Sequence, residues 1–439
     1  MAKGMKGIDM KKLTSKQYRL TSLLLFSMFF GAGNLIFPPL VGRLAGHETW
    51  WTMLAFGITA VVLPVLGVVA VSKSKGLMNL AGRVHPVFAV FFTIVIYMSI
   101  GPFLGIPRAG SLPFVMAVQP YLPKSVPMDL ALLAYTVIFF LVAFWLCVTP
   151  SKLLDRVGKV LTPTLLMLML ILFVASLIHP LGSYQAATGS YASSPLLQGF
   201  VDGYQTMDAV AALNFGLVIT QVIEGFGISQ QDSPKVTLRA GLGAGTILML
   251  IYLMLAHLGA SSAGVLSAEN GAEILRGVAN QLFGGLGAIL MALIFTLACL
   301  TTCVGLLSSI SQYFYSLTKK GSYKAWLVMW VVISTILANF GLNQILAYSV
   351  AVLVAIYPVA IILILLGNSP IESKLTYRLT VGVAGAISLV QMLASLNLPI
   401  PVLYNLYLQL PLANLGLAWA LPSVIAFGLG MAIDWLKKA

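Results

Sequence analysis

A short run of small and amide residues interrupts an apolar stretch near the start of the chain. Gly31–Asn34 (Gly-Ala-Gly-Asn) follows an apolar segment and precedes Pro38-Pro39. Glycine and proline disfavour helix interiors, so the pattern predicts a broken helix. The second half-helix would present the N–H groups of Ala32 and Gly33 and a positive dipole end, which suit a carboxylate. The first half-helix would present carbonyl oxygens near Ser27 and Phe30, which suit a cation.

A second interruption falls within Gly199–Ala209, where two carboxylates and two glycines share an otherwise apolar span. A charge at the centre of a bilayer costs about 2.5–3.5 kcal/mol on insertion scales, so it normally faces a cavity or a partner. Asp202 could lie near the outer interface, whereas Asp208 is deeper. For the first interruption, glycines that only allow close helix packing remain the alternative.

The composition places these features in a membrane. The chain of 439 residues is 59% hydrophobic and 8% charged, whereas soluble domains carry about 25% charged residues. A span needs about 20 mostly apolar residues. The sequence therefore predicts an all-α polytopic membrane protein with about twelve spans, at 20–45, 49–72, 86–112, 128–148, 153–178, 196–224, 236–265, 284–318, 325–340, 343–366, 376–396 and 410–435.

The basic residues support this count. Alternating the twelve spans puts 21 of the 25 Lys and Arg on the side of the N-terminus, and only Arg43, Arg108, Lys124 and Arg276 on the other. Positive charge marks cytoplasmic loops, so both termini are predicted to be cytoplasmic. The net charge of +13 then reflects contact with anionic membrane lipids, and no nucleic-acid partner is expected.

Interruptions in the first and sixth spans divide the first ten spans into five plus five, the pattern of inverted-repeat transporters. The predicted parts are a basic cytoplasmic segment 1–19, a first repeat 20–178, a second repeat 196–366, and two further spans within 376–435.

The surroundings of the breaks indicate the cargo. The expected lining is apolar: Phe29, Phe30, Phe37, Met98, Met207 and Val210. No Lys or Arg is expected near the midplane, so backbone N–H groups alone would hold an anionic group. A small amino acid with an aliphatic body fits such a site. In the eighth span, Thr301 and Thr302 offer hydroxyl oxygens of the kind sodium prefers, although hydrogen bonding to their own helix is the alternative.

The chain resembles the bacterial branched-chain amino acid carriers, the cation-coupled leucine, isoleucine and valine symporters. The resemblance covers nearly the whole sequence and rests on Phe30–Pro39, Gly101-Pro102 with Pro107-Arg108, Gly203–Asp208, Ala298–Leu300 and Ile356–Pro358. It implies a LeuT-type fold, a place in the cytoplasmic membrane of a bacterial cell, and L-leucine, L-isoleucine and L-valine as cargo. The implied substrate-binding residues are Phe30, Gly31, Ala32, Gly33, Asn34, Tyr204, Gln205, Thr206, Met207 and Asp208.

The resemblance also implies a sodium site, formed by the carbonyls of Ser27, Phe30 and Ala298 with the hydroxyls of Thr301 and Thr302. Asn34 and Thr206 could contribute to a second cation site. Sodium is expected as the coupling ion, and no other cofactor. Lys159 in the fifth span is an alternative proton carrier, since a buried lysine can shift its pKa, although its depth also allows it to reach the interface.

Two other function classes fit poorly. A channel would carry rings of like charge or repeated filter loops. An enzyme would need a clustered nucleophile or metal site, yet His47, His85, His179 and His257 are scattered and no enzyme activity is expected. The three cysteines lie in apolar runs as packing residues. Nothing in the sequence specifies an oligomeric state.

Overall fold

The computed structural model describes residues 13–340, 342–398 and 400–437, with side chains throughout except at 342–350. Every regular element in these ranges is a helix. Nine helical stretches of the described residues are long and apolar enough to cross a membrane, and two shorter apolar helices accompany them. The predicted all-α polytopic membrane fold is therefore confirmed. Of the predicted basic segment 1–19, residues 1–12 lie outside the described ranges.

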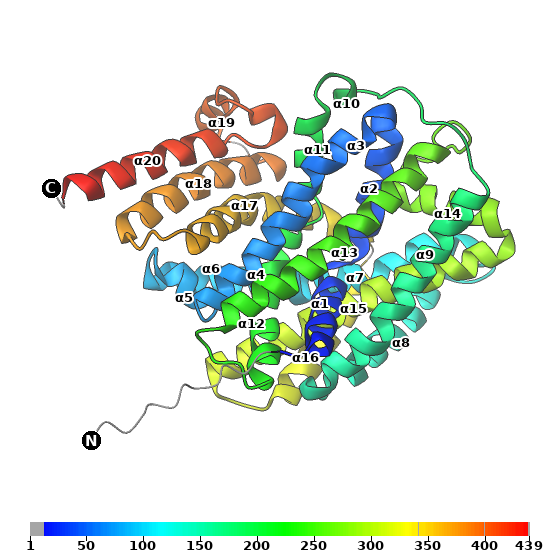
Figure 1. Ribbon diagram of the computed structural model, residues 1–439, viewed down its shortest axis with the longest axis horizontal. Coiled ribbons are helices and arrows are strands. Elements are labelled where there is room, and N and C mark those ends of the chain that lie inside the picture. The colour runs from blue at the N-terminus through cyan, green and yellow to red at the C-terminus, as the bar shows by residue number, and fades with distance from the viewer. Residues whose placement is uncertain (1–12, 341, 399, 438–439) are drawn as a thin grey trace.

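The predicted spans can be followed in chain order in Figure 1. The first and sixth spans are each divided into two helices by a non-helical break, and the second and third spans also contain two α-helices each. The spans are α1 (Ser15–Phe29) with α2 (Ala32–Ala45), α3 (Thr49–Gly57) with α4 (Leu63–Lys73), α6 (Pro86–Met98) with α7 (Gly105–Pro113), α8 (Met128–Cys147), α9 (Thr162–Ile178), α11 (Pro195–Tyr204) with α12 (Asp208–Gly225), α13 (Ser233–Ser262), α15 (Gly285–Thr318), α16 (Tyr323–Ala338), α17 (Leu342–Asn368), α18 (Lys374–Ser395) and α20 (Ala420–Leu436).

Short helices connect the spans: α5 (Leu77–Gly82), α10 (Ser190–Ser193), α14 (Gly271–Phe283) and α19 (Pro401–Leu408). Local capping chemistry explains where several helices begin. Thr14 Oγ1 accepts a hydrogen bond from the Gln17 N–H at 3.2 Å, and the Gln17 side chain accepts from the Thr14 N–H at 2.8 Å. This capping box satisfies two N–H groups that an open helix end would leave unpaired.

The structure changes two of the predicted boundaries. The first break is confined to Phe30 and Gly31, so Pro38 and Pro39 lie inside α2. The third span does not end at residue 112 but continues to Tyr121, because π-helical turns at Ser99–Phe103 and Phe114–Val118 carry the chain past its prolines. The longer span places the residues around position 108 well away from its end.

Close packing of α2 against α13 sets the position of the first break. A methyl group on Gly42 would lie 1.9 Å from the Ala256 carbonyl oxygen, and one on Gly259 would lie 1.9 Å from the Pro39 carbonyl oxygen. The two backbones therefore approach as in other small-residue contacts between membrane helices. Glycines thus allow close helix packing between α2 and α13, on the part of α2 that follows the break.

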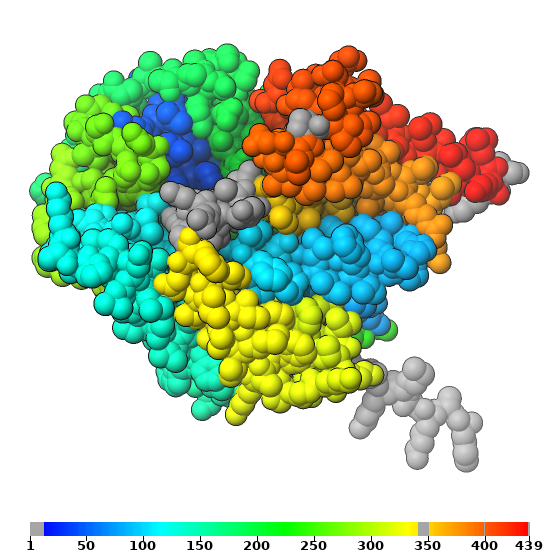
Figure 2. Space-filling view, turned by 180° about the vertical axis from the view of Figure 1, so that it is seen from behind, coloured from blue at the N-terminus to red at the C-terminus, as the bar shows by residue number. Residues whose placement is uncertain are grey.

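The last helices form a separate group at one edge of the bundle. Figure 1 shows α17, α18 and α20 side by side, on the opposite side of the bundle from α8, α9 and α14. In the space-filling view of Figure 2 this C-terminal part projects at one end of the molecule. It is joined to the bundle through α17, which packs on α4 and α12.

We predict that Gly259→Ala destabilises the protein by about 1–3 kcal/mol, because the added methyl overlaps a backbone atom that cannot move aside. Thermal unfolding of the purified protein in detergent measures this. The matched control is Gly382→Ala in α18, where an added methyl meets nothing within 4 Å. Equal melting temperatures for the two variants would contradict the close approach of α2 and α13.

Candidate functional site

The break in the first span leaves backbone N–H donors without carbonyl acceptors. Gly31 is extended, with φ −114° and ψ −159°, and its N–H donates to Asn34 Oδ1 at 2.9 Å. In the described structure no backbone carbonyl accepts from the N–H groups of Ala32 and Gly33 across the break, and the Ala32 N–H meets the Cys299 sulfur, a weak acceptor. These donors and the positive end of the α2 dipole line a cavity inside the bundle. Such an end favours an anionic group.

The break in the sixth span lies opposite. It comprises Gln205 to Met207, and Met207 adopts the left-handed conformation with φ 68°, which is costly for a side chain of this kind. The Thr206 hydroxyl donates to the Gly203 carbonyl at 2.9 Å, which satisfies one oxygen at the end of α11. A methyl on Gly33 would lie 3.5 Å from the Thr206 carbonyl, so the two breaks are in contact.

A buried polar network ties the two breaks to a third helix. Asn34 Nδ2 donates to Asp208 Oδ2, and its amide also contacts the hydroxyl of Tyr252 in α13. The Tyr252 hydroxyl in turn donates to Asp208 Oδ2 at 3.1 Å. All three side chains are buried. The sequence analysis does not predict Tyr252 as a site residue. The only indication in the sequence is that its hydroxyl group lies within a long apolar span.

Four of the five predicted sodium ligands, all except Phe30, fall into two contacting pairs. Thr302 Oγ1 lies 3.3 Å from the Ser27 carbonyl at the end of α1, and Thr301 Oγ1 lies 3.0 Å from the Ala298 carbonyl. A methyl on Gly31 would lie 3.0 Å from Thr302 Oγ1, so this hydroxyl sits against the break itself. The Thr301 hydroxyl therefore donates to a carbonyl of its own helix. Such a bond was the alternative to sodium binding for both threonines.

A cavity of about 80 Å³ lies where the two breaks meet. Seven of the predicted substrate-binding residues line it, together with Thr302 and the predicted apolar residue Phe29. Other lining residues come from α1, from the third span, from α12 and from α15. The predicted residues in the lining are Gly31, Ala32, Gly33, Asn34, Thr206, Met207 and Asp208, and the further ones include Met28, Ile100, Gly105, Arg108, Ala109, Ala211, Cys299 and Leu306.

Three predicted substrate-binding residues do not line this cavity. The Phe30 ring stacks on Phe26 with centroids 5.1 Å apart, and Gln205 is exposed. The Tyr204 ring packs on Tyr357 of α17, with centroids 3.8 Å apart. The two aromatic side chains therefore pack around the breaks, and Gln205 does not.

The expectation that no Lys or Arg lies near the breaks is wrong, because Arg108 lines the cavity. The third span is kinked at Gly101, which has non-helical φ −82° and ψ −124°, and at Gly105, where a methyl would lie 1.9 Å from the Ile100 carbonyl oxygen. The kink and the continuation of the span to Tyr121 bring Arg108 to the level of the breaks. A span ending at residue 112 would have left it near the outer interface.

Lys159 lies elsewhere. It forms an i,i+4 ion pair with Asp155, and 44% of its side-chain surface is exposed. It does not line the cavity at the breaks. The burial that would make this lysine a proton carrier is therefore missing, which matches the alternative in which its long side chain reaches the interface.

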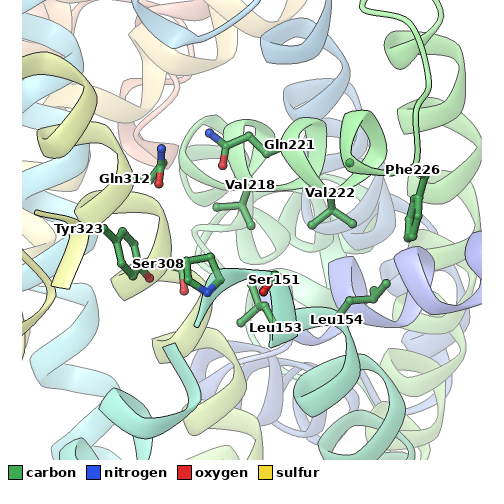
Figure 3. A pocket seen from close by; sticks show the side chains of 12 residues that line it. Ser151, Leu153, Leu154, Val218, Gln221, Val222, Phe226, Ser308, Gln312 and Tyr323 are labelled. Atoms are coloured by element: carbon green, nitrogen blue, oxygen red, sulfur yellow. The ribbon is translucent and has the colours of Figure 1, made fainter. Parts of the chain in front are cut away.

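A larger cavity of about 360 Å³ lies farther along α12 and α15. Figure 3 shows Val218 and Gln221 of α12 facing this space, with Ser308 and Gln312 of α15 on another side. On α12 the lining residues Ala211 of the small cavity and Val218 of the larger one are seven positions apart, which is about 10 Å of helix. The edge-to-face contact of Phe29 with Phe215, with ring centroids 5.6 Å apart, lies between them.

Comparisons with known proteins agree with this architecture. The family model for the branched-chain amino acid transport protein matches residues 14–437. The branched-chain amino acid permease BraB of Bacillus subtilis is 39% identical over 96% of both chains. The branched-chain amino acid transport system 2 carrier protein of Pseudomonas aeruginosa is 40% identical over 94% of both chains.

Two solved structures share the fold. Mhp1, a nucleobase-cation-symport-1 family transporter in a closed conformation with bromovinylhydantoin bound, aligns with a TM-score of 0.58 at 13% identity, covering 96% of this chain and 92% of its own. MhsT in complex with L-phenylalanine aligns with a TM-score of 0.51 at 16% identity, covering 95% and 98%. The fold is thus the LeuT type, with five-plus-five inverted repeats and two further helices. By its sequence, the chain belongs to the branched-chain amino acid transport protein family.

Proposed function

We propose that the protein imports L-leucine, L-isoleucine and L-valine by sodium symport through alternating access. The observation that carries the proposal is the cavity at the two breaks, where N–H groups of α2 without carbonyl acceptors and the carboxylate of Asp208 border an otherwise mainly apolar space. The N–H groups of Ala32 and Gly33 bind the substrate carboxylate, and Asp208 accepts from its ammonium group. The aliphatic side chain contacts Phe29, Ile100 and Met207.

Sodium binds between α1 and α15 in this proposal. The carbonyls of Ser27, Phe30 and Ala298 and the hydroxyls of Thr301 and Thr302 are its ligands, supported by the 3.3 Å contact of Thr302 with the Ser27 carbonyl. Hard cations prefer such oxygen ligands. The exposed ion pair of Lys159 argues against the proton-coupled alternative.

Sodium entry provides the driving force for transport. One charge falling through ~100 mV supplies about 2.3 kcal/mol, and a tenfold sodium gradient adds about 1.4 kcal/mol. Together these allow several hundredfold accumulation of substrate per sodium ion.

The larger cavity serves as the route of release. Substrate in the small cavity would reach it by passing Met28 and Phe29 of α1, Phe215 of α12 and Leu306 of α15. The Met28 side chain lies close against Gly305, since a methyl on that glycine would be 2.9 Å from Met28 Cγ. Movement of α1 away from α15 would open this barrier and separate the Ser27 carbonyl from Thr302, which couples sodium release to substrate release.

The direction of transport follows from the distribution of basic residues. With both termini on the cytoplasmic side of a bacterial cytoplasmic membrane, the larger cavity lies toward the cytoplasm, because α12 runs inward from the break.

In liposomes containing the purified protein, we expect uptake of leucine, isoleucine and valine only under an inward sodium gradient. Counterflow of labelled leucine would confirm a carrier and exclude a channel. Equal uptake driven by a proton gradient in sodium-free buffer would overturn the sodium assignment and restore Lys159 as a candidate.

Thr302→Ala should raise the sodium concentration for half-maximal uptake about five- to thirtyfold, because one ligand worth about 1–2 kcal/mol is removed. The control is Thr246→Ala in α13, whose exposed hydroxyl bonds only to the Leu242 carbonyl of its own helix. An unchanged sodium dependence in Thr302→Ala would remove this threonine from the site.

Asp208→Asn should lower the uptake efficiency for leucine by about 100-fold, because the amide keeps the shape but lacks the charge that attracts the ammonium group. Asp202→Asn is the control, since this carboxylate bonds to Tyr191 and Gln198 and lies outside the cavity. Asp208→Asn with normal uptake would exclude the carboxylate from substrate binding.

A further inference from the structure

Arg108 brings an uncompensated positive charge into the cavity at the breaks. Its Nε is buried and has no hydrogen-bond partner, and its Nη1 contacts only the Met207 sulfur, at 3.6 Å. No Asp or Glu in the described ranges lies within ion-pair distance of its guanidinium. A thioether is a weak acceptor, so the sulfur contact does not replace the water that the guanidinium has lost. A charge held this way normally serves a partner that the free protein does not contain.

The cavity lining contains one positively and one negatively charged side chain, which could bind the two charged groups of a zwitterion. Arg108 carries a positive charge, the N–H groups of Ala32 and Gly33 carry partial positive charges, and the only carboxylate in the lining is Asp208. Arg108 and Asp208 do not form an ion pair in the described structure. Asp208 Oδ2 is instead held by Asn34 and Tyr252. A ligand that carries both an anionic and a cationic group could therefore complete both sides at once.

The kink in the third span holds Arg108 at this position. Gly101 packs against Ile310 and Gly105 against Leu306, both in α15, the helix that also carries Thr302 and Cys299 at the cavity. Arg108 follows the kink by one turn, with its N–H bonded to the Leu104 carbonyl at 3.1 Å. The backbone that aims the guanidinium is thus fixed against the same helix that forms the other wall of the cavity.

We propose that Arg108 is a specificity-determining residue, whose guanidinium binds the substrate carboxylate together with the N–H groups of α2. This inference rests on the proposed function, since it names how the same site selects its cargo. Arginine suits this role because its planar fork can donate two parallel hydrogen bonds to one carboxylate. The site then selects α-amino acids over amines and amides that carry the same aliphatic side chain.

The test compares two ligands that differ only at the carboxyl group. Binding of labelled leucine to the purified protein in nanodiscs is measured, with unlabelled leucine and leucinamide as competitors. Arg108→Gln keeps a polar side chain of moderate length but removes the charge. It should weaken leucine binding about ten- to 100-fold, the loss expected for charge-assisted hydrogen bonds. Leucinamide binding should change less than about threefold, or improve, because its only charge is positive.

Two further variants separate this role from a structural one. Arg108→Lys keeps the charge without the fork and should recover part of the preference for leucine over leucinamide. Arg43→Gln is the control, because this arginine of α2 lies outside the cavity and donates to the Leu266 carbonyl at 2.8 Å. It should leave the preference between the two ligands unchanged.

The outcomes are distinct. Equal losses for leucine and leucinamide in Arg108→Gln would show a purely structural role and overturn the inference. Failure of the wild-type protein to bind leucine would instead overturn the proposed function. A preference for leucine that survives in Arg108→Gln would assign carboxylate recognition to the helix end alone.

Discussion

Everything at the centre of this protein depends on the requirement that backbone polar groups inside a membrane find partners. In hydrocarbon an unpaired N–H or C=O group costs several kcal/mol, so a helix can be broken only where other groups satisfy the freed backbone. Here Asn34 accepts from the Gly31 N–H, and Thr206 donates to the Gly203 carbonyl. The N–H groups of Ala32 and Gly33 border a cavity, and the Ala32 N–H has only the Cys299 sulfur as an acceptor. In the function proposed here, a bound substrate carboxylate supplies the stronger acceptors that these groups lack.

The surrounding helices make the two breaks possible. α2 is held by its glycine contacts with α13, and the same helix provides Tyr252, which bonds to Asp208 across the breaks. The sodium site proposed here uses the opposite end of the break, where the Ser27 carbonyl meets Thr302. In this proposal the first break has an anion-binding end and a cation-binding end, and each contacts a different helix. Movement of α1 relative to α15 would act on the cation-binding end first.

Charge is used sparingly inside the bundle. The lining of the cavity contains one arginine and one carboxylate, held apart from each other, and the rest of it is mainly apolar. Two separated charges fit a zwitterion better than either charge alone would. An apolar lining gains energy from contact with an aliphatic side chain but offers little to a polar one. The combination fits a branched-chain amino acid and agrees with the family to which the chain belongs.

The sequence by itself determined the membrane class, the order of the spans and the two regions in which helices are broken, because these depend on local properties: apolar length, glycine and proline. It also gave the break at Gly31 its polarity, since helix ends have a fixed dipole. Tertiary structure alone decided that Tyr252 meets Asp208, that Tyr204 packs on Tyr357, and that Arg108 enters the cavity. These outcomes depend on how far each span extends and how it is rotated against distant helices. At Arg108, a nine-residue continuation of one span to Tyr121 changed an interfacial residue into a residue of the site.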